Sequence, residues 1–420
     1  MAVVKKEMKN GLILATEAMP CVRSVSLGVW VRVGSRHESE STTGISHFIE
    51  HLLFKGTKSR SAAHIAEEID SVGGQLNAFT DKEYVGFYAK VIDKHLTFAL
   101  ELLSDIVRNP AFPEHELERE RNVIFEEISM VEDSPQDLIQ DLFMENFWRG
   151  HPLGRPISGT RKSVAQITRP QVLRFFKRHY TARNMIISVA GNIRHREVHA
   201  LVVRYFSDLD PGDALDAGAP PVAYPARVVR RKLSLEQTHI CLGASCPPMD
   251  SKQRYCTHIL SSVLGGGMSS RLFQNIREKR GLVYTIYSTP NLYHDAGNLL
   301  VYAGAAPKKA AEVVELTIKE FRRLRERLVP AEELTRAKES VKGSVVLSLE
   351  SPSSRMTNLA QQLIYFGRFY SLQEILRGFD SVRPVDVREL ANEIFGRLTI
   401  ALIALASRNG EDLKSVAMEV

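Results

Sequence analysis

Residues 47–51 read His-Phe-Ile-Glu-His (HFIEH), and both the fold and the chemistry of the chain can be approached from this segment. On a helix, residues at i, i+3 and i+4 are surface neighbours with Cβ atoms about 5–6 Å apart, so His47, Glu50 and His51 would share one face. Two imidazoles can bind Zn²⁺, which needs a third protein ligand and, in catalytic sites, keeps a position open for water. The order matches the inverted zincin pattern, with Glu50 as general base. An incidental pair of histidines on a helix is the competing interpretation.

A second predicted helix supplies the candidate third ligand. Residues 117–131 read LERERNVIFEEISMV, and their apolar residues recur at helical spacing with Glu120 and Glu127 on the same stripe. Adjacent residues are about 100° apart around a helix, so Glu127 points inward and Glu126 points outward. An inward carboxylate is destabilising unless it has a partner, and a metal ion is a suitable one. We predict that Glu127 is the third ligand.

Glu120 lies one heptad before Glu127, about 10 Å away along the helix axis. This distance is too long for both carboxylates to bind the same ion directly. We therefore predict that Glu120 assists by orienting a metal ligand or the substrate. For both carboxylates, an Arg or Lys partner from elsewhere in the core is the alternative.

The composition is that of an ordinary soluble protein with more than one core. The chain has 420 residues, of which 44% are hydrophobic and 25% are charged, which is enough for two or more domains. Its N-terminus lacks the features of a signal or transit peptide, and no apolar run approaches the ~20 residues that span a bilayer. The four cysteines show no C-x-x-C spacing, which favours a reducing compartment. We expect a cytoplasmic protein without membrane insertion.

The charge pattern argues against nucleic-acid binding. The net charge is +6, and the lysines and arginines are dispersed along the chain. The densest basic run, RRLRER at residues 322–327, is typical of a solvated helix face.

A segment rich in proline and glycine divides the chain almost in half. It reads DLDPGDALDAGAPPVAY from residue 208 onward and has the composition of a linker between domains. We predict the α+β class, with two layered α/β-sandwich domains that have antiparallel-rich sheets and helices packed on them. The predicted boundaries are 1–207 for the N-terminal domain, 208–225 for the linker and 226–420 for the C-terminal domain. Hydrophobic periodicity predicts strands at residues 25–33, 84–91 and 299–303 and helices at 96–107 and 309–327.

The two halves also resemble one another, which indicates an internal duplication. A shift of 211 residues lays His47 on His258, and a shift of 217 residues aligns the second helix with a segment that starts near Val329. At these shifts the counterparts of the predicted site residues are His258, Ser261, Ser262, Ala337 and Ser344. We predict that the second copy has lost the metal site.

Four segments carry the most specific patterns: HFIEHLLFKGT, GGQLNAFTDKE, ERERNVIFEEI and RLFQNIREKRGLVY. With them, the chain resembles the pitrilysin/insulinase family of metallopeptidases, most closely its processing-peptidase branch. The resemblance implies a zinc endopeptidase with one Zn²⁺ per chain, bound by His47, His51 and Glu127. In that family Glu50 would activate water and Glu120 would assist.

The resemblance also implies how substrate binds. Family members take the peptide as an added strand beside a segment that matches residues 76–80 (LNAFT), which favours extended peptides. Within it, Asn77, Ala78 and Phe79 are the predicted substrate-binding residues. Arg277 and Tyr284 match a pair from the family's second half that reaches the substrate near the metal. From the residues alone, these two are ordinary surface or core residues.

Further expectations concern substrates and partners. Larger family members enclose their substrate with four such domains, so we expect this chain to form a homodimer or to pair with a related subunit. The acidic segment at residues 114–141 favours basic peptides. Leader removal and general peptide degradation use the same site, and both stay open. A non-catalytic scaffold in a larger complex is the alternative function, because the family's architecture also serves that role.

Overall fold

The computed structural model describes residues 3–213, 215, 218–232, 235–396, 400–407 and 413–416. The chain forms two compact units. The first unit consists of residues 1–130, 155–218 and 348–369, and the second consists of residues 131–154, 219–347 and 370–420.

These units differ from the predicted domains at 1–207 and 226–420 in two segments. The change between units at Gly218 falls inside the predicted linker, of which residues 214, 216 and 217 lie outside the described residues. Residues 131–154, however, belong to the second unit, and residues 348–369 belong to the first. Each half of the chain therefore lends one segment to the other unit.

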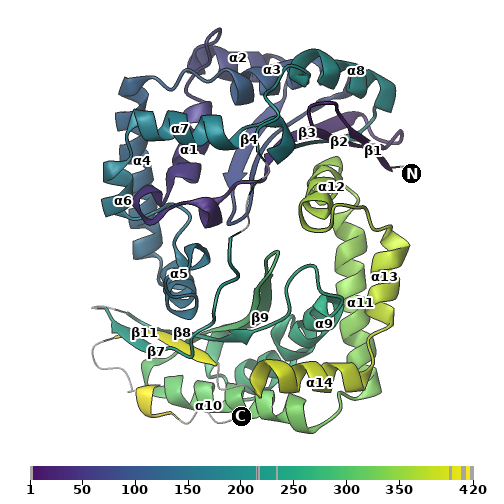
Figure 1. Ribbon diagram of the computed structural model, residues 1–420. Coiled ribbons are helices and arrows are strands. Elements are labelled where there is room, and N and C mark those ends of the chain that lie inside the picture. The colour runs from purple at the N-terminus through teal and green to yellow at the C-terminus, as the bar shows by residue number, and fades with distance from the viewer. Residues whose placement is uncertain are drawn as a thin grey trace. The chain divides into compact units, whose positions relative to one another are not determined.

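The first unit contains a mixed six-stranded sheet (Figure 1). In spatial order its strands are β1 (Val3–Glu7), β2 (Ile13–Ala18), β6 (Met185–Gly191), β3 (Ser24–Val31), β5 (Val85–Ile92) and β4 (Gln75–Thr80). β2 and β6 are parallel, and the other neighbours are antiparallel. β4 forms one edge, and β5 is the only strand of the described residues that pairs with it.

The helices of the first unit cover both faces of this sheet. They are α1 (Ile45–Leu53), α2 (Ala62–Ser71), α3 (Leu96–Arg108), most of α4 (Glu114–Asp133), α6 (Arg161–Gln166), α7 (Arg169–His179), α8 (His195–Phe206) and α12 (Pro352–Phe366). In β3, Val25, Leu27 and Val29 join the core that includes α1, α3 and α8. Trp30 points to the opposite face and shares a cluster with Met356 of α12. Figure 1 shows α12 on the side of the sheet away from α3 and α8.

The second unit repeats this topology in a five-stranded sheet. Its strands, in spatial order, are β7 (Arg227–Arg231), β11 (Ala401–Ala406), β8 (Thr238–Ser245), β10 (Gly297–Ala305) and β9 (Val283–Leu292). β7 and β11 are parallel, and the other pairs are antiparallel. The helices are α5 (Pro135–Phe147), α9 (Arg254–Gly265), α10 (Ala310–Glu326), α11 (Ala331–Ser348), α13 (Leu372–Asp380), α14 (Pro384–Phe395) and a π-helix at Phe273–Glu278.

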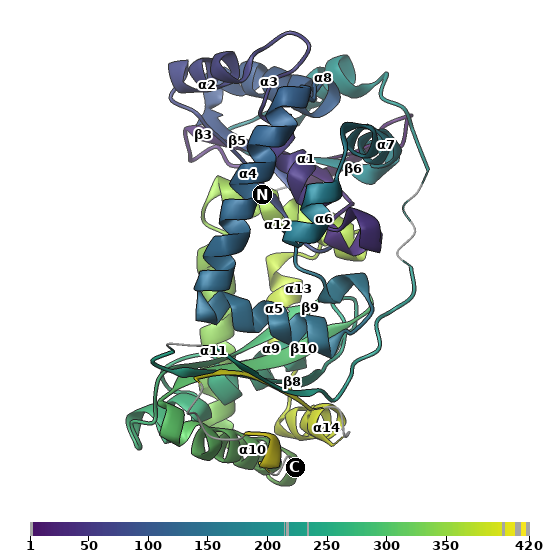
Figure 2. The same cartoon turned by 90° about the vertical axis from the view of Figure 1, so that its left-hand side faces the viewer.

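The two halves exchange one helix each. α5, from the first half, packs on β8 and β11, and α12, from the second half, packs on β3 and β6. Figure 2 shows α5 on one side of the second sheet and α10 and α14 on the other. Glycines make room for both helices, because a Cβ at Gly243 would meet Phe143 and a Cβ at Gly28 would lie 3.1 Å from Met356. The exchange explains why the compact units differ from the predicted domains.

The predicted strands and helices agree with β3, β5, β10, α3 and α10 to within two residues at each end. The inner strands of both sheets (β3, β6, β8, β10 and β11) are buried on two faces. These strands therefore read as nearly continuous apolar runs. Among the helices in the described part of the chain, none combines the length and the apolar composition that a bilayer span requires.

Candidate metal centre

Helix α1 carries the HFIEH segment, with its apolar residues in the core. Phe48, Ile49 and Leu52 are fully buried, as expected for the apolar face of an amphipathic helix. His47 and His51 occupy another face, and their ring centroids lie 4.7 Å apart. The core packing of α1 therefore fixes the position of both imidazoles.

The N-terminus of α1 is capped by a carboxylate from outside the helix. The N-cap residue Gly44 has a φ of 95° and no side chain that could accept a hydrogen bond. Instead, the backbone N–H groups of Gly44 and Ser46 donate to Glu38 at 2.7 and 2.8 Å. Burial raises the pKa of Glu38 to about 7, although the two hydrogen bonds act in the opposite direction. The cap at Glu38 was not predicted from the sequence, where its only signal is an acidic residue shortly before a helix start.

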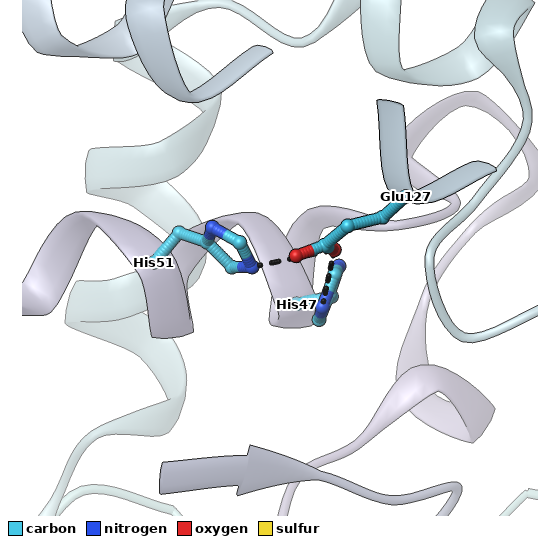
Figure 3. Close-up of side chains that lie close together, drawn as sticks. All are labelled: His47, His51 and Glu127. Carbon is cyan, nitrogen blue, oxygen red and sulfur yellow. Dashed lines mark ion pairs between the residues drawn. The ribbon is translucent and has the colours of Figure 1, made fainter. Parts of the chain in front are cut away.

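His47, His51 and Glu127 come together from α1 and α4 (Figure 3). Glu127 Oε2 lies 3.5 Å from His47 Nε2 and 3.6 Å from His51 Nε2. Both separations are too long for good hydrogen bonds. Two atoms bound tetrahedrally to one zinc ion at about 2.1 Å would lie about 3.4 Å apart. The spacing of the three residues therefore fits a shared ion better than it fits direct contacts.

Each of the two histidines has a feature that suits a metal ligand. Burial, followed by the charge of His51, lowers the pKa of His47 to about 4, so this imidazole is neutral near pH 7. His51 Nδ1–H donates to Glu120 Oε2 at 3.0 Å, which leaves Nε2 on the side of Glu127. An imidazole whose second nitrogen is hydrogen-bonded to a carboxylate is the usual arrangement of a zinc ligand, and His51 has this arrangement.

Glu120 is the buried carboxylate behind His51. Its side chain is 5% exposed, and its other oxygen pairs with Lys55 Nζ at 2.8 Å. Both expectations for Glu120 are therefore met. It contacts His51, a predicted metal ligand, and it also has a lysine partner. Glu127 is 40% exposed, because its carboxylate faces the two histidines rather than the apolar core.

Glu50 contacts the edge strand β4. The Thr80 hydroxyl donates to Glu50 Oε2 at 2.5 Å. Burial raises the pKa of Glu50 above its ordinary value, and the hydrogen bond from Thr80 partly offsets this rise. A carboxylate with a raised pKa is better suited to act as a base near neutral pH. Thr80 belongs to the predicted substrate strand, but the sequence does not predict its contact with Glu50.

The predicted substrate-binding residues Asn77, Ala78 and Phe79 all lie on β4. The backbone N–H of Ala78 donates to the side chain of Asn77 at 2.8 Å, which indicates that this N–H faces the open edge of the sheet. The ring of Phe79 lies on the α12 face, with its centroid 5.7 Å from that of Trp30.

Arg277 and Tyr284 lie together in the second unit. The guanidinium carbon of Arg277 is 5.3 Å from the ring centroid of Tyr284 and 4.6 Å from that of Phe273. Tyr284 is 75% exposed, so its ring is available for further contacts. Contact of this pair with substrate near the metal stays a prediction.

Comparison with known proteins gives the family. Residues 13–161 match the family described as insulinase (peptidase family M16), and residues 166–341 match the peptidase M16 inactive domain. An uncharacterized zinc protease of Mycobacterium leprae is 39% identical, over 94% of this chain and 90% of its own. The uncharacterized zinc protease YmxG of Bacillus subtilis is 38% identical, over 92% of this chain and 94% of its own.

Solved structures show the same fold. A protease from Helicobacter pylori superposes with a TM-score of 0.91 at 24% identity, over 96% of this chain and 99% of its own. A chain of Complex III2 from Candida albicans superposes with a TM-score of 0.84 at 21% identity, over 96% of both chains. Since relatives at 38–39% identity span nearly the whole chain and are named zinc proteases, this chain belongs to the insulinase (M16) family and is a zinc protease.

Proposed function

We propose that the chain is an endopeptidase that hydrolyses extended peptides bound along β4. The observation that carries this proposal is the hydrogen bond from Thr80 to Glu50. It joins the edge strand, where a peptide can be added, to the carboxylate that can take a proton. His47, His51 and Glu127 would hold the zinc ion beside this carboxylate.

The protein's own groups have distinct roles in this proposal. Zn²⁺ at these ligands would supply Lewis-acid chemistry, which lowers the pKa of water toward about 7 and stabilises negative charge on a carbonyl oxygen. Glu50 accepts the proton of the attacking water and returns it to the leaving amine. Thr80 fixes the orientation of the Glu50 carboxylate. Glu120 fixes the ring of His51, and Lys55 balances the charge of Glu120.

The position of β4 supports extended substrates. An edge strand has unpaired backbone groups to which another strand can bind. The Ala78 N–H is one such group, and the Asn77 side chain that now accepts from it would turn away when a peptide carbonyl takes its place. A helix, or a strand that is already paired on both sides in a folded sheet, cannot make these hydrogen bonds. Flexible peptides are therefore the expected class of substrate.

The direct test is cleavage of a quenched fluorescent peptide library by the purified chain, before and after treatment with 1,10-phenanthroline. Bound zinc is measured on the same sample. We expect chelator-sensitive cleavage with one zinc per chain. Stoichiometric zinc without any cleavage would contradict the proposal and favour a non-catalytic scaffold. Leader removal, a preference for basic peptides, pairing with a second or related subunit and a cytoplasmic location stay predictions.

A further inference from the structure

A hollow of about 360 Å³ lies beside β4 in the first unit. Phe79 and Tyr88 line it from the sheet, and Ser353, Thr357 and Gln361 are among the residues that line it from α12. The described residues that line the hollow include no charged side chain. It is therefore a neutral space with aromatic rings on one side and short polar groups on the other.

The hollow exists because α12 has two different faces. Met356 and Leu359 are buried against the sheet. Ser353, Thr357 and Gln361 follow one another at intervals of four residues, so they lie on a single stripe of the helix. Only short or unbranched polar side chains occur on this stripe, and they leave the space open.

Hydrogen bonds hold this wall of the hollow in place. The Ser353 hydroxyl is hydrogen-bonded to that of Ser26 on β3 at 2.9 Å. The Gln361 side-chain amide donates to the Tyr84 hydroxyl at 2.8 Å. The first bond connects α12 to β3, and the second connects it to the turn between β4 and β5. The hollow is therefore part of a packed structure.

The alternation of side chains along β4 shows on which side of the strand the hollow lies relative to Glu50, the proposed base. Successive residues of a strand point to opposite faces. Thr80 points to the face where its hydroxyl meets Glu50, and Phe79 points to the face where the hollow lies. A peptide strand added beside β4 has the same alternation. One of its side chains must therefore point toward the hollow when its neighbour points toward the Glu50 side.

We propose that this hollow is a specificity subsite for one bulky, uncharged side chain, aromatic or long aliphatic, of a peptide bound along β4. The inference rests on the proposed function. Phe79 and Tyr88 favour such a side chain through aromatic and apolar contacts. A lysine or arginine there would lose water without gaining a carboxylate partner, which is unfavourable. Any preference for basic residues then concerns other positions of the peptide.

The test measures both binding and cleavage. Labelled peptides carry Gly, Leu, Phe or Lys at each position in turn. Their binding to the full-length Glu50→Gln variant is followed by fluorescence anisotropy. Their cleavage is measured with the parent chain. At one position we expect Phe and Leu to bind and react at least about 10-fold better than Gly and Lys. In Thr357→Trp the larger side chain fills the hollow. This variant should bind and cleave the Phe and Leu peptides less well and the Gly peptide equally well, so that the preference falls to less than about twofold.

Two further variants control for indirect effects. Thr335→Trp introduces the same side chain at an exposed position of α11 and should keep the preference of the parent chain. Thr357→Leu is a smaller change for which misfolding is less of a concern, and it should reduce binding of the Phe peptide more than that of the Leu peptide.

The outcomes separate the subsite from the peptidase mechanism. A preference in binding without cleavage by the parent chain would support the subsite and refute the proposed function. Cleavage with no side-chain preference at any position, or a Thr357→Trp variant with the parent's preference, would overturn the subsite and leave the peptidase standing. Absence of binding for every peptide would overturn both.

Discussion

The two compact units have the same sheet topology, yet their chemistry differs. The strand order β2-β6-β3-β5-β4 of the first unit recurs as β7-β11-β8-β10-β9 in the second, and each sheet is covered on one face by a helix from the other half. Within the described residues, however, only α1 and α4 of the first unit bring together histidines and a carboxylate in the geometry of a metal site. The same topology thus forms with and without these residues.

In the second unit, the residues aligned with the candidate metal site make ordinary packing contacts and hydrogen bonds. His258 on α9 is half-buried, with its ring 6.3 Å from that of Phe379. Ser344 on α11 donates its hydroxyl to the backbone of its own helix at Ser340, and Ala337 lies in the apolar core. None of these residues requires an ion. The comparison supports the proposal that His47, His51 and Glu127 are present for a metal ion rather than for the sheet.

The largest expected effect comes from removing a metal ligand. His51→Ala leaves two ligands, so we expect zinc content below about a tenth of the parent's and no detectable cleavage. The matched control is His258→Ala in the second unit. This variant should keep zinc and the cleavage rate within about twofold while lowering the free energy of unfolding by about 0.5–3 kcal/mol, the usual range for single substitutions. Zinc loss of equal size in both variants would contradict the assignment of the metal to the first unit.

Substitution of Glu50, the proposed base, should impair catalysis without affecting metal binding. Glu50→Gln keeps the ligands, so zinc content should be unchanged while kcat falls by about 10²–10⁴-fold, the usual contribution of a general base. Steady-state kinetics together with zinc analysis provide the measurement. Ser261→Ala, at the aligned position of α9, should leave kcat unchanged. A Glu50→Gln variant that turns over at the parent rate would falsify the role of Glu50 as base.

The sequence predicted those parts of the site that depend on helix periodicity. His47, His51 and Glu127 were identified because each helix places its polar residues at regular intervals. The contacts of Glu38 and Thr80 were not predicted, because they depend on how a loop and an edge strand pack against α1.

The helix exchange could not be predicted for a similar reason. Both α5 and α12 begin with a serine followed by proline, at Ser134 and Ser351, which is a local signal for a helix start. That signal does not specify which sheet the helix covers. The choice is made by tertiary contacts such as Phe143 over Gly243.

Glu38 offers a pH-dependent test of the same comparison. It caps α1 from outside the helix. The 211-residue shift lays Met249, which precedes α9, on Glu38, and the N-cap of α9 has no side-chain hydrogen bond. The pKa of Glu38 in the folded chain is about 7, above the ordinary value of 4.5. The stabilisation associated with this raised pKa is therefore fully present below pH 4.5 and is lost as the pH rises through 7.

The expected size of this loss is about 3 kcal/mol, since one unit of pKa corresponds to about 1.4 kcal/mol. Relative to Glu38→Gln, the chelated parent chain should lose this much free energy of unfolding between pH 4.5 and pH 8. Urea unfolding at several pH values measures the difference. Glu40→Gln, at an exposed neighbouring position, should show a difference that does not change with pH. A flat difference for Glu38→Gln as well would contradict the raised pKa.

The smallest expected effect concerns the residue that holds a ligand in place. Glu120 accepts from His51 Nδ1–H, and removing such a partner usually weakens metal binding by 10–100-fold, about 1.4–2.7 kcal/mol. We expect Glu120→Ala to raise the zinc dissociation constant by this factor, measured by competition with a chelator. In the second unit the aligned Ala337 already lacks this carboxylate.

Lys55 provides the control that assigns this effect to the histidine contact rather than to local charge. Lys55→Met removes the cation that pairs with Glu120 but leaves the bond between Glu120 and His51. Lys55 is 32% exposed, and ion pairs that reach solvent contribute little, about 0–1 kcal/mol. The zinc dissociation constant of Lys55→Met should therefore stay within about fivefold of the parent's. If Lys55→Met weakens zinc binding as much as Glu120→Ala does, the effect of Glu120 depends on the ion pair, and orientation of His51 cannot be its main contribution.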